Sequence, residues 1–374
     1  MARAALSAFD VSGYARSRNE VWPGHRRGAS RLSPYIRYGL LSLRQVWDHV
    51  AAGPAQDVTR YRDELLWQEY ARHLYARVGV ATAEPLTGTP PPTGSALPDL
   101  PGSCEDPWDR SMACMDAAVG DLTRDGWVVN QARMWLASQW TVRCGRDWRE
   151  GEQVFFTHLL DGSRAANRLG WQWTTGAATG RPYGFSRAQV RRRAPGMCEA
   201  CARHDDCPVE TPVERGVSTD VSAGRSPRLR RDDDPQATAG PHRPLITGSP
   251  EMVWVTGESL GDDDPALLAH PDLPVVFVWD EPLLARLRLS GPRLVFLAET
   301  LAELGRRRDL MLLLGDPRDM LRGRRVAVTF APVPGFRWRA RAVQPVAVHP
   351  YPWLVRPGSG PVTSLSAWRR HLGA

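Results

Sequence analysis

The sequence predicts an all-α domain followed by an α/β domain with a parallel sheet. The chain has 374 residues, 42% of them hydrophobic, which is enough for two domains with separate cores. Helical patterns dominate residues 1–212, whereas short apolar runs alternate with helical patterns in residues 248–374. Residues 213–247 are rich in Ser, Gly, Pro and Arg, so they are predicted to form a disordered linker.

Three segments of the first domain have the spacing of apolar residues that is typical of helices. In residues 41–50, Ser42 can cap a helix whose apolar side chains recur every three or four positions. Residues 58–78 and 128–144 have the pattern of two longer helices. These segments are therefore expected to form the framework of the first domain.

Each of the two longer helices places an uncommon set of side chains on one face, because residues three and four apart are neighbours on a helix. One set combines an amide, a guanidinium and a thioether, and the other combines a carboxylate, an indole and an amide. The sets are Asn130, Arg133 and Met134, and Glu64, Trp67 and Gln68. A solvated helix face with packed aromatic residues would explain either set alone, so neither set by itself predicts a function.

Five short apolar runs of the second domain are predicted to be buried strands. They are residues 251–255, 273–280, 310–317, 325–332 and 344–351. Residues 292–308 between them have the pattern of an amphipathic helix. Strands that alternate with helical crossovers form parallel sheets, so we expect a Rossmann-like domain. No Gly-x-Gly-x-x-Gly follows the first strand, which argues against a dinucleotide in this domain.

The composition is compatible with a polyanionic partner. All the basic residues are Arg, and the formal net charge is +7. Guanidinium groups bind phosphate, although a coding bias towards Arg would give the same composition. The start of the chain lacks the apolar segment of a signal peptide, and no apolar run is long enough to span a membrane. We therefore expect a cytoplasmic monomer without a membrane partner.

Five separated blocks of the first domain are similar to the FAD-binding domain of DNA photolyases and cryptochromes, in the same order and at about the same spacing. The blocks are "ASRLSPYIRYG", "RDELLWQEYARHL", "GWVVNQARMWLASQW", "DWREGEQVFFTHLLDG" and "AANRLGWQW". The resemblance covers about residues 10–185. It implies an FAD-dependent lyase that repairs cyclobutane pyrimidine dimers in DNA under blue light, by electron transfer from reduced flavin. The alternative is a cryptochrome-like photoreceptor or regulator that binds FAD without repair.

The resemblance also implies which residues bind FAD. They are Tyr14, Ser30, Arg31, Leu32, Ser33, Tyr61, Asn130, Arg133, Asp161, Ser163 and Asn167. The family holds the FAD phosphates at the position of residues 30–33, and the start of a helix suits an anion. Arg133 and Asp161 match a buried pair beside the flavin, where a guanidinium favours the reduced, anionic form. Asn167 matches the residue that faces flavin N5.

Two tryptophans match the chain of tryptophans that photoreduces FAD in this family. Trp171 resembles the member next to the flavin, and Trp148 resembles the middle member. Three residues are candidates for the outer member, namely Trp108, Trp135 and Trp140. The residues expected to take part in catalysis are Trp171, Trp148, Asn167 and Glu64.

The family's repair enzymes flip a pyrimidine dimer out of DNA into a cavity above the flavin. The residues expected at this DNA-binding face are Glu64, Trp67, Gln68, Asn130, Met134 and Trp173. Glu64 and Trp67 match residues that hydrogen-bond and stack on the dimer, which favours repair. Gln68 departs from a usual Arg, and Ser163 departs from a usual acid, which favours the photoreceptor alternative.

The second domain resembles the α/β antenna domain of the same family, which normally comes first, so the domain order is permuted. After the first strand, the family's usual Arg-Arg-Asp is replaced by Thr256, Gly257 and Glu258. This replacement argues against a second, antenna chromophore.

The cysteines near the end of the first domain suggest a metal site. Cys198, Cys201 and Cys207 have the spacing C-x₂-C-x₅-C, and disulfides are not expected in the cytoplasm. A branch of bacterial photolyase-like proteins carries a [4Fe–4S] cluster, and by this resemblance Cys114 supplies the fourth ligand. Cys104 is the second candidate for that ligand. Zinc with His204 and unligated thiols are the alternatives.

Overall fold

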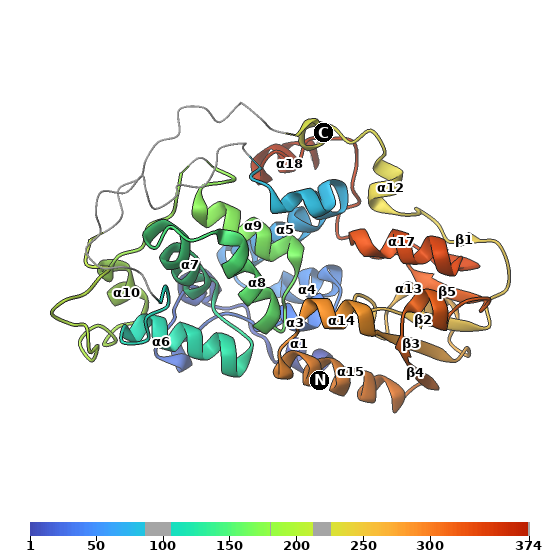
Figure 1. The fold of residues 1–374 in the computed structure, drawn as a ribbon, viewed down its shortest axis with the longest axis horizontal. Coiled ribbons are helices and arrows are strands. Elements are labelled where there is room, and N and C mark those ends of the chain that lie inside the picture. The colour runs from blue at the N-terminus through green and yellow to red at the C-terminus, as the bar shows by residue number, and fades with distance from the viewer. Residues whose placement is uncertain (87–105, 180, 212–225, 373–374) are drawn as a thin grey trace.

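The computed structural model describes residues 1–86, 106–179, 181–211 and 226–372. In Figure 1, helices coloured blue to green form one side of the molecule, and an orange sheet with its helices forms the other side. All the elements assigned up to residue 211 are helices, and all the strands come after that residue. No helix in these described ranges is both long enough and apolar enough to cross a membrane.

The three helices predicted in the first domain are confirmed. Ser42 and Gln45 form a capping box at the start of α4, in which each side chain bonds the main chain of the other residue. Shorter helices precede α4, namely α1 (Ala2–Ala8), α2 (Tyr14–Ser17) and α3 (Ser33–Arg37). The main helices are α4 (Leu43–His49), α5 (Ala55–Val78), α6 (Ala113–Gly120), α7 (Asn130–Ser138), α8 (Trp148–His158), α9 (Arg164–Thr175) and α10 (Arg187–Arg193).

The sheet has the order β1-β6-β5-β2-β3-β4, and all its pairs are parallel except β1 with β6. The strands are β1 (Leu245–Ile246), β2 (Met252–Val255), β3 (Val275–Asp280), β4 (Leu310–Gly315), β5 (Val326–Thr329) and β6 (Ala347–His349). The five predicted strands are confirmed as β2 to β6. The two-residue β1 was not predicted, and its antiparallel pairing with β6 makes the sheet mixed rather than purely parallel.

Helices cover both faces of the sheet. The buried side chains of α13 (Pro265–Ala269) and α15 (Gly291–Gly305) pack on one face. Those of α17 (Pro334–Val343) pack on the other face. The helix predicted over residues 292–308 is α15. The remaining helices of this part are α14 (Glu281–Leu287), α16 (Pro317–Met320) and α18 (Leu365–Leu372).

The prediction of a disordered linker over residues 213–247 is wrong for residues 226–247. These residues form α11 (Pro227–Arg230), α12 (Pro235–Ala239) and β1. Leu229 is buried against α5, and Asp232 pairs with the buried Arg77 at 3.2 Å. Hydrogen bonds to distant segments add to these two contacts, such as that from Asp232 N to the Ser359 carbonyl at 3.0 Å and that from the Trp353 indole to the Ala239 carbonyl at 2.9 Å. Long-range contacts thus order a segment that is poor in apolar residues. Residues 213–225 of the predicted linker lie outside the described residues.

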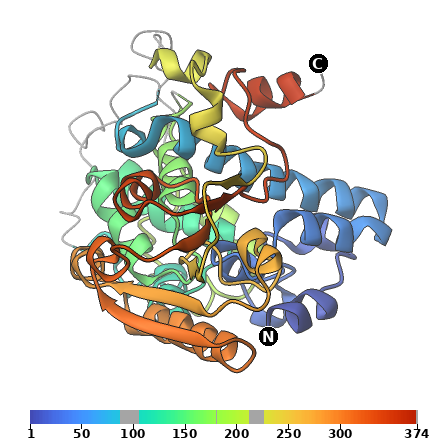
Figure 2. The same cartoon turned by 90° about the vertical axis from the view of Figure 1, so that its right-hand side faces the viewer.

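The C-terminal segment of the chain packs on α5, in the helical region. The Glu69 carboxylate accepts a hydrogen bond from Val355 N at 2.9 Å, and Arg77 donates to the Gly360 carbonyl at 2.7 Å. Trp368 of α18 is buried, and its indole N–H donates to His73 Nδ1 at 3.0 Å. In Figure 2 the red C-terminal helix accordingly lies away from the orange strands. Val362 and Trp368 of this segment therefore complete the core around α5.

Glu69 gives this contact a dependence on pH. Burial raises the pKa of the Glu69 carboxyl from 4.5 to about 7. The folded protein therefore binds this proton more tightly than the unfolded chain. The resulting stability is fully present below pH 4.5 and is lost as the pH rises through 7.

We expect Glu69→Gln to remove this loss, because glutamine carries no charge to bury. The variant should gain on the order of 2–3 kcal/mol relative to the unchanged protein between pH 5 and pH 8. The measurement is the free energy of unfolding in urea at both pH values. The control is Glu281→Gln at an exposed position. If the two variants show the same dependence on pH, the account of Glu69 is wrong.

Candidate functional site

A buried ion pair joins α7 to the segment before α9. Arg133 Nη2 donates to Asp161 Oδ2 at 2.8 Å, and Arg133 Nε donates to the Val128 carbonyl at 2.8 Å. The Asp161 side chain is 8% exposed. Within the described residues, its second oxygen, Oδ1, has no hydrogen-bond partner. The structure thus brings together the predicted pair and leaves one buried acceptor for a ligand.

Two further predicted residues lie at the start of α9. Ser163 is the N-cap residue of α9, but its side chain makes no capping hydrogen bond. Asn167 is buried one turn later, and its amide nitrogen also lacks a partner within the described part of the chain. A buried polar group without a partner costs about 1–3 kcal/mol. Asn167 and Asp161 therefore offer a donor and an acceptor that a bound ligand could satisfy.

Tyr14, Tyr61 and Ser30 form one cluster, as the resemblance implies. Tyr61 donates its hydroxyl hydrogen to Ser30 Oγ at 2.9 Å, and the two tyrosine rings meet edge to face at 4.7 Å. Burial raises the pKa of Tyr61 to about 12 and also raises the pKa of Tyr14, so both hydroxyls stay protonated. Before Tyr14, Gly13 has a φ of 77°, and its N–H donates to Asp57 at 2.9 Å.

Residues 31–33 are held by Trp127. The Arg31 guanidinium lies 4.8 Å from the centre of the Trp127 ring, and the Trp127 N–H donates to Ser33 Oγ at 3.3 Å. The side chain of Leu32 is fully buried in the hydrophobic core. The side chain of Leu32 therefore belongs to the core, and binding of FAD by this residue stays a prediction. Trp127 was not predicted, although it lies in the block "GWVVNQARMWLASQW".

Two arginines hold the turn that carries Asp161. The Gly162 carbonyl accepts hydrogen bonds from Arg37 Nε at 3.1 Å and from Arg293 Nη2 at 2.6 Å. Arg293 belongs to α15, and Arg37 also pairs with Glu258, after β2, at 2.6 Å. A Cβ atom on Gly162 would lie 2.8 Å from the main-chain carbonyl oxygen of Leu159, so the close approach requires glycine. Sequence reasoning missed these residues because the contacts join distant segments.

The predicted DNA-facing residues of α5 share one face of that helix. Glu64 forms an ion pair with Arg18, and burial raises the pKa of the Glu64 carboxyl whereas Arg18 lowers it. The Trp67 ring contacts Tyr70 at 5.8 Å. Gln68 is half-buried on the same helix. Arg18 was not predicted, and it occupies one oxygen of the carboxylate expected to bind the dimer.

The predicted DNA-facing residues of α7 and α9 form two contacts. Asn130 lies at the start of α7, and its amide nitrogen is 3.8 Å from the sulfur of Met134, one turn later. Trp173, near the end of α9, is 36% exposed, and its ring lies 5.7 Å from that of Tyr183. Asn130 and Trp173 are thus accessible to a large ligand.

Trp171 and Trp148 are both buried between α8 and α9. Trp171 is 2% exposed, and its ring packs directly on Gly151 of α8. Trp148 is 1% exposed and lies one turn before Gly151. Both tryptophans are therefore placed by the packing of α9 on α8.

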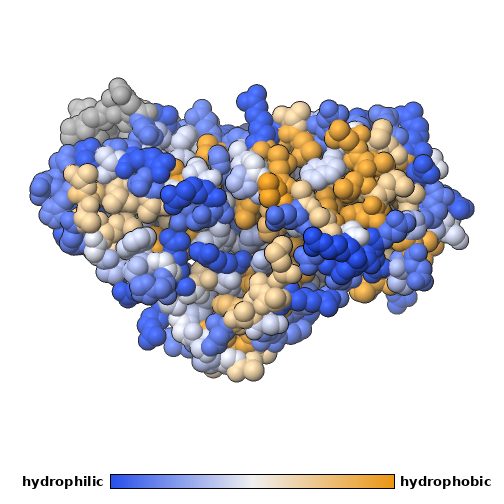
Figure 3. All heavy atoms as spheres, turned by 90° about the horizontal axis from the view of Figure 1, so that it is seen from below, coloured by the Kyte–Doolittle hydropathy of each residue, from blue (hydrophilic) through white to orange (hydrophobic). Residues whose placement is uncertain are grey.

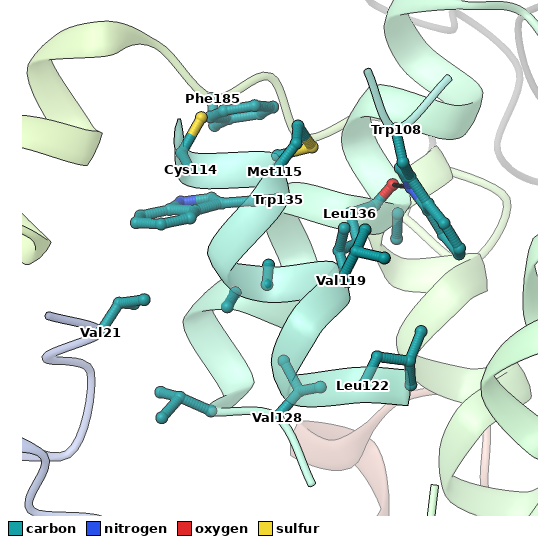
Figure 4. Packing of buried hydrophobic residues seen from close by; sticks show 14 of the residues in the cluster. Val21, Trp108, Cys114, Met115, Val119, Leu122, Val128, Trp135, Leu136 and Phe185 are labelled. Carbon is teal, nitrogen blue, oxygen red and sulfur yellow. Dashed lines mark hydrogen bonds between the residues drawn. The ribbon is translucent and has the colours of Figure 1, made fainter. Parts of the chain in front are cut away.

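The three candidates for the outer tryptophan differ in position. The centre of the Trp171 ring lies 5.0 Å from that of Phe155, and the Phe155 ring lies 6.1 Å from that of Trp108. The Trp108 ring in turn lies 5.0 Å from that of Trp140. Trp135 instead stacks on Phe185, near Cys114, as Figure 4 shows. The ring contacts thus connect Trp108 and the partly exposed Trp140, rather than Trp135, to Trp171.

The four cysteines predicted as metal ligands are free and line one cavity. They are Cys114, Cys198, Cys201 and Cys207. Burial raises the pKa of Cys114 to about 12 and also raises that of Cys198, so these thiols are neutral unless a cation binds. No group of three or more His, Cys, Asp or Glu side chains in the described ranges is arranged around a single ion. The arrangement therefore does not fit a mononuclear site such as zinc.

One expectation about the cysteines needs correction. Cys144 is disulfide-bonded, whereas the sequence analysis expected no disulfide. His204, the alternative ligand for zinc, is half-buried and lines the same cavity as the four cysteines. Its Nδ1 lies 2.9 Å from Asp205 Oδ1, so Nε2 is the ring nitrogen that could bind a metal. Cys104, the second candidate for the fourth ligand, lies outside the described residues.

Residues 108–193 match the family model described as the FAD binding domain of DNA photolyase. Three curated relatives carry the name deoxyribodipyrimidine photo-lyase. The Synechococcus protein is 32% identical over 39% of this chain and 32% of its own length. The Vibrio cholerae protein is 32% identical over 42% of this chain and 35% of its own length. The Thermus thermophilus protein is 32% identical over 47% of this chain and 42% of its own length. The aligned part thus spans less than half the length of each relative.

Two solved structures are also similar. A class III photolyase from Agrobacterium tumefaciens has a TM-score of 0.44 and 26% identity, over 54% of this chain and 43% of its own. A cryptochrome from Synechocystis has a TM-score of 0.45 and 21% identity, over 54% of this chain and 44% of its own.

The packing of Trp171 on Gly151 gives a direct test of this part of the site. A Cβ atom at Gly151 would lie 2.2 Å from the Trp171 ring, whereas nothing lies within 4 Å of a Cβ atom at Gly170. We expect Gly151→Ala to destabilise the protein by about 1–3 kcal/mol through overpacking. Gly170→Ala, the matched control in α9, should be neutral or stabilising by up to about 1 kcal/mol. Urea unfolding measures both, and equal effects would contradict the described packing.

Proposed function

We propose that the helical region of this chain belongs to the DNA photolyase and cryptochrome family, and that the protein binds FAD and repairs cyclobutane pyrimidine dimers under blue light. The observation that carries the proposal is the buried pair Arg133 and Asp161 beside Asn167. This group lies inside the matched region and contains buried polar atoms without partners. Such atoms fit the polar edge of a flavin, which offers both hydrogen-bond donors and acceptors.

The chain's own residues would bind and tune the cofactor. Asp161 fixes the Arg133 guanidinium, whose positive charge favours a negatively charged ring next to it. Ser30 and Ser33, with the main chain between them, would bind the phosphates, because helix α3 begins at this point. The Asn167 amide would supply a hydrogen bond to the ring. When bound and reduced, FAD would supply the electron that light transfers to the dimer.

The DNA face would lie on α5 and α7. The Trp67 indole is available to stack on a flipped base, which is worth about 1–3 kcal/mol per base. Glu64 would accept a hydrogen bond from the dimer through the carboxylate oxygen that Arg18 leaves free. Asn130 and Met134 would form the opposite wall of the cavity. DNA that contains pyrimidine dimers is therefore the proposed partner.

The tryptophans would resupply electrons to the cofactor during photoreduction. Trp171 would be the inner member, with Trp148 as the proposed middle member. The ring contacts support Trp108 and Trp140 as the outward continuation, because Trp140 is partly exposed and can exchange electrons with a reductant in solution.

We also propose that the four free thiols hold a [4Fe–4S] cluster. The support is chemical: four cysteines line one cavity, and four thiolates are the ligand set of such clusters. In such a cluster each cysteine would bind a different iron.

Trp171→Phe tests the proposed electron route. The variant should lose photoreduction of oxidised FAD, followed as bleaching of flavin absorbance under blue light. It should keep repair by chemically reduced protein, because Trp171 feeds the cofactor and does not contact the lesion. Trp135→Phe, at an equally buried position, is the control and should keep both activities.

The same assay tests the function itself, as loss of dimers from ultraviolet-treated oligonucleotide with dark controls. Protein that stays colourless after incubation with FAD would contradict the flavin site. Protein with reduced FAD that binds damaged DNA no better than undamaged DNA, and splits no dimer, would reject repair. The photoreceptor alternative would then remain.

Cys114→Ser tests the cluster. Anaerobically purified protein should contain about four irons per chain, and the variant should contain much less. Cys144→Ser is the control, because Cys144 is disulfide-bonded and is not among the four free cysteines that line the cavity. Unchanged protein without iron, or equal iron in both variants, would contradict the proposal.

A further inference from the structure

The strand β4 forms an apolar edge of the sheet. β4 pairs with β3 along one side, and none of the residues that the structure describes pairs with its other side. Met311, Leu312 and Leu314 are 46%, 50% and 64% exposed. Proteins usually protect an edge strand with charged residues, proline or a bulge, and the sequence LMLLLG of β4 has no such residue. Figure 3 shows apolar residues gathered on this half of the molecule.

Alternate residues of β4 direct their main-chain groups away from the sheet. Val275 N donates to the Asp309 carbonyl at 2.7 Å, so the main-chain groups of Asp309 face β3. Because successive residues of a strand face opposite edges, the N–H and C=O groups of Leu310, Leu312 and Leu314 face outward. The side chains of these three leucines share one face of the sheet, where Leu310 packs on the core beneath α15.

We propose that β4 pairs antiparallel with β4 of a second copy of the chain, about a two-fold axis at Leu312. Leu312 then lies opposite the partner's Leu312, and Leu310 lies opposite the partner's Leu314. Both outward-facing rows of main-chain groups are paired in this register. The leucines of both copies meet on one face, so the sheet continues through the dimer.

Charge favours this register over its neighbours. With the axis at Leu312, Arg308 lies opposite the partner's Asp316, whose carboxylate also pairs with Arg318 of its own chain at 2.5 Å. An axis at Leu310 would place Arg308 opposite a leucine, and an axis at Leu314 would place Asp316 opposite a leucine. Only the central axis pairs leucine with leucine and opposite charges with each other. This dimer would replace the monomer expected from the sequence, and it does not depend on the proposed function.

Disulfide trapping tests the register. In an antiparallel pair that exchanges both main-chain hydrogen bonds, the Cα atoms are about 5.5 Å apart, which a disulfide spans. Under mild oxidation, Leu312→Cys should therefore form a covalent dimer of twice 41.6 kDa. Leu314→Cys is the control, because its side chain lies opposite the partner's Leu310 and far from its own copy. Equal crosslinking of both variants, or none in either, would overturn the proposal.

The mass in solution tests the dimer without a new cysteine. Sedimentation over a concentration series should show unchanged protein approaching twice 41.6 kDa. Leu312→Lys should stay at the mass of one chain, because the charge would have to be buried between the copies. Ile246→Lys, at 64% exposure on the opposite edge of the sheet, should still dimerise. Unchanged protein that stays monomeric throughout, or loss of the dimer in both variants, contradicts the proposal.

Discussion

The carbonyl oxygen of Gly162 is the point on which the arrangement of the site depends. It accepts hydrogen bonds from Arg37 of the helical region and from Arg293 of α15. Arg293 is almost fully buried, and the Phe156 and Gly162 carbonyls accept hydrogen bonds from its guanidinium, which offsets the cost of burying the charge. The adjacent residue is Asp161, the partner of Arg133. The α/β region therefore positions the acid of the proposed flavin site, although it contributes no side chain to that site.

The helical region and the α/β region are also joined by contacts on either side of Gly162. At one end, Arg37 pairs with Glu258 in the loop after β2. At the other end, the C-terminal segment packs on α5 and pairs its main chain with Glu69 and Arg77. Charged groups are buried at each contact, and each has a charged or main-chain partner. Such contacts favour one relative position of the two regions, because displacement would leave charges buried without partners.

Local patterns predicted most of the fold, and long-range contacts account for the rest. The helix after Ser42 and the strands β2 to β6 follow from capping and apolar periodicity, which act over a few residues. The ordered residues 226–247 escaped prediction because their order comes from α5, far away in sequence. The pair Arg133 and Asp161 was inferred from a resemblance, whereas the contact of Arg293 with Gly162 has no local signal. The Arg18 contact with Glu64 was missed for the same reason.

The central claim is that Asp161, held in place through Gly162, completes a site for FAD. The most direct test is a titration of the full-length chain with FAD, followed by flavin fluorescence, for the unchanged protein and for Asp161→Asn. We expect one FAD per chain, and binding at least about tenfold weaker in the variant, because a loss of about 1.4 kcal/mol corresponds to tenfold in affinity. Equal affinity of the two proteins, or no binding by the unchanged protein, would contradict the account.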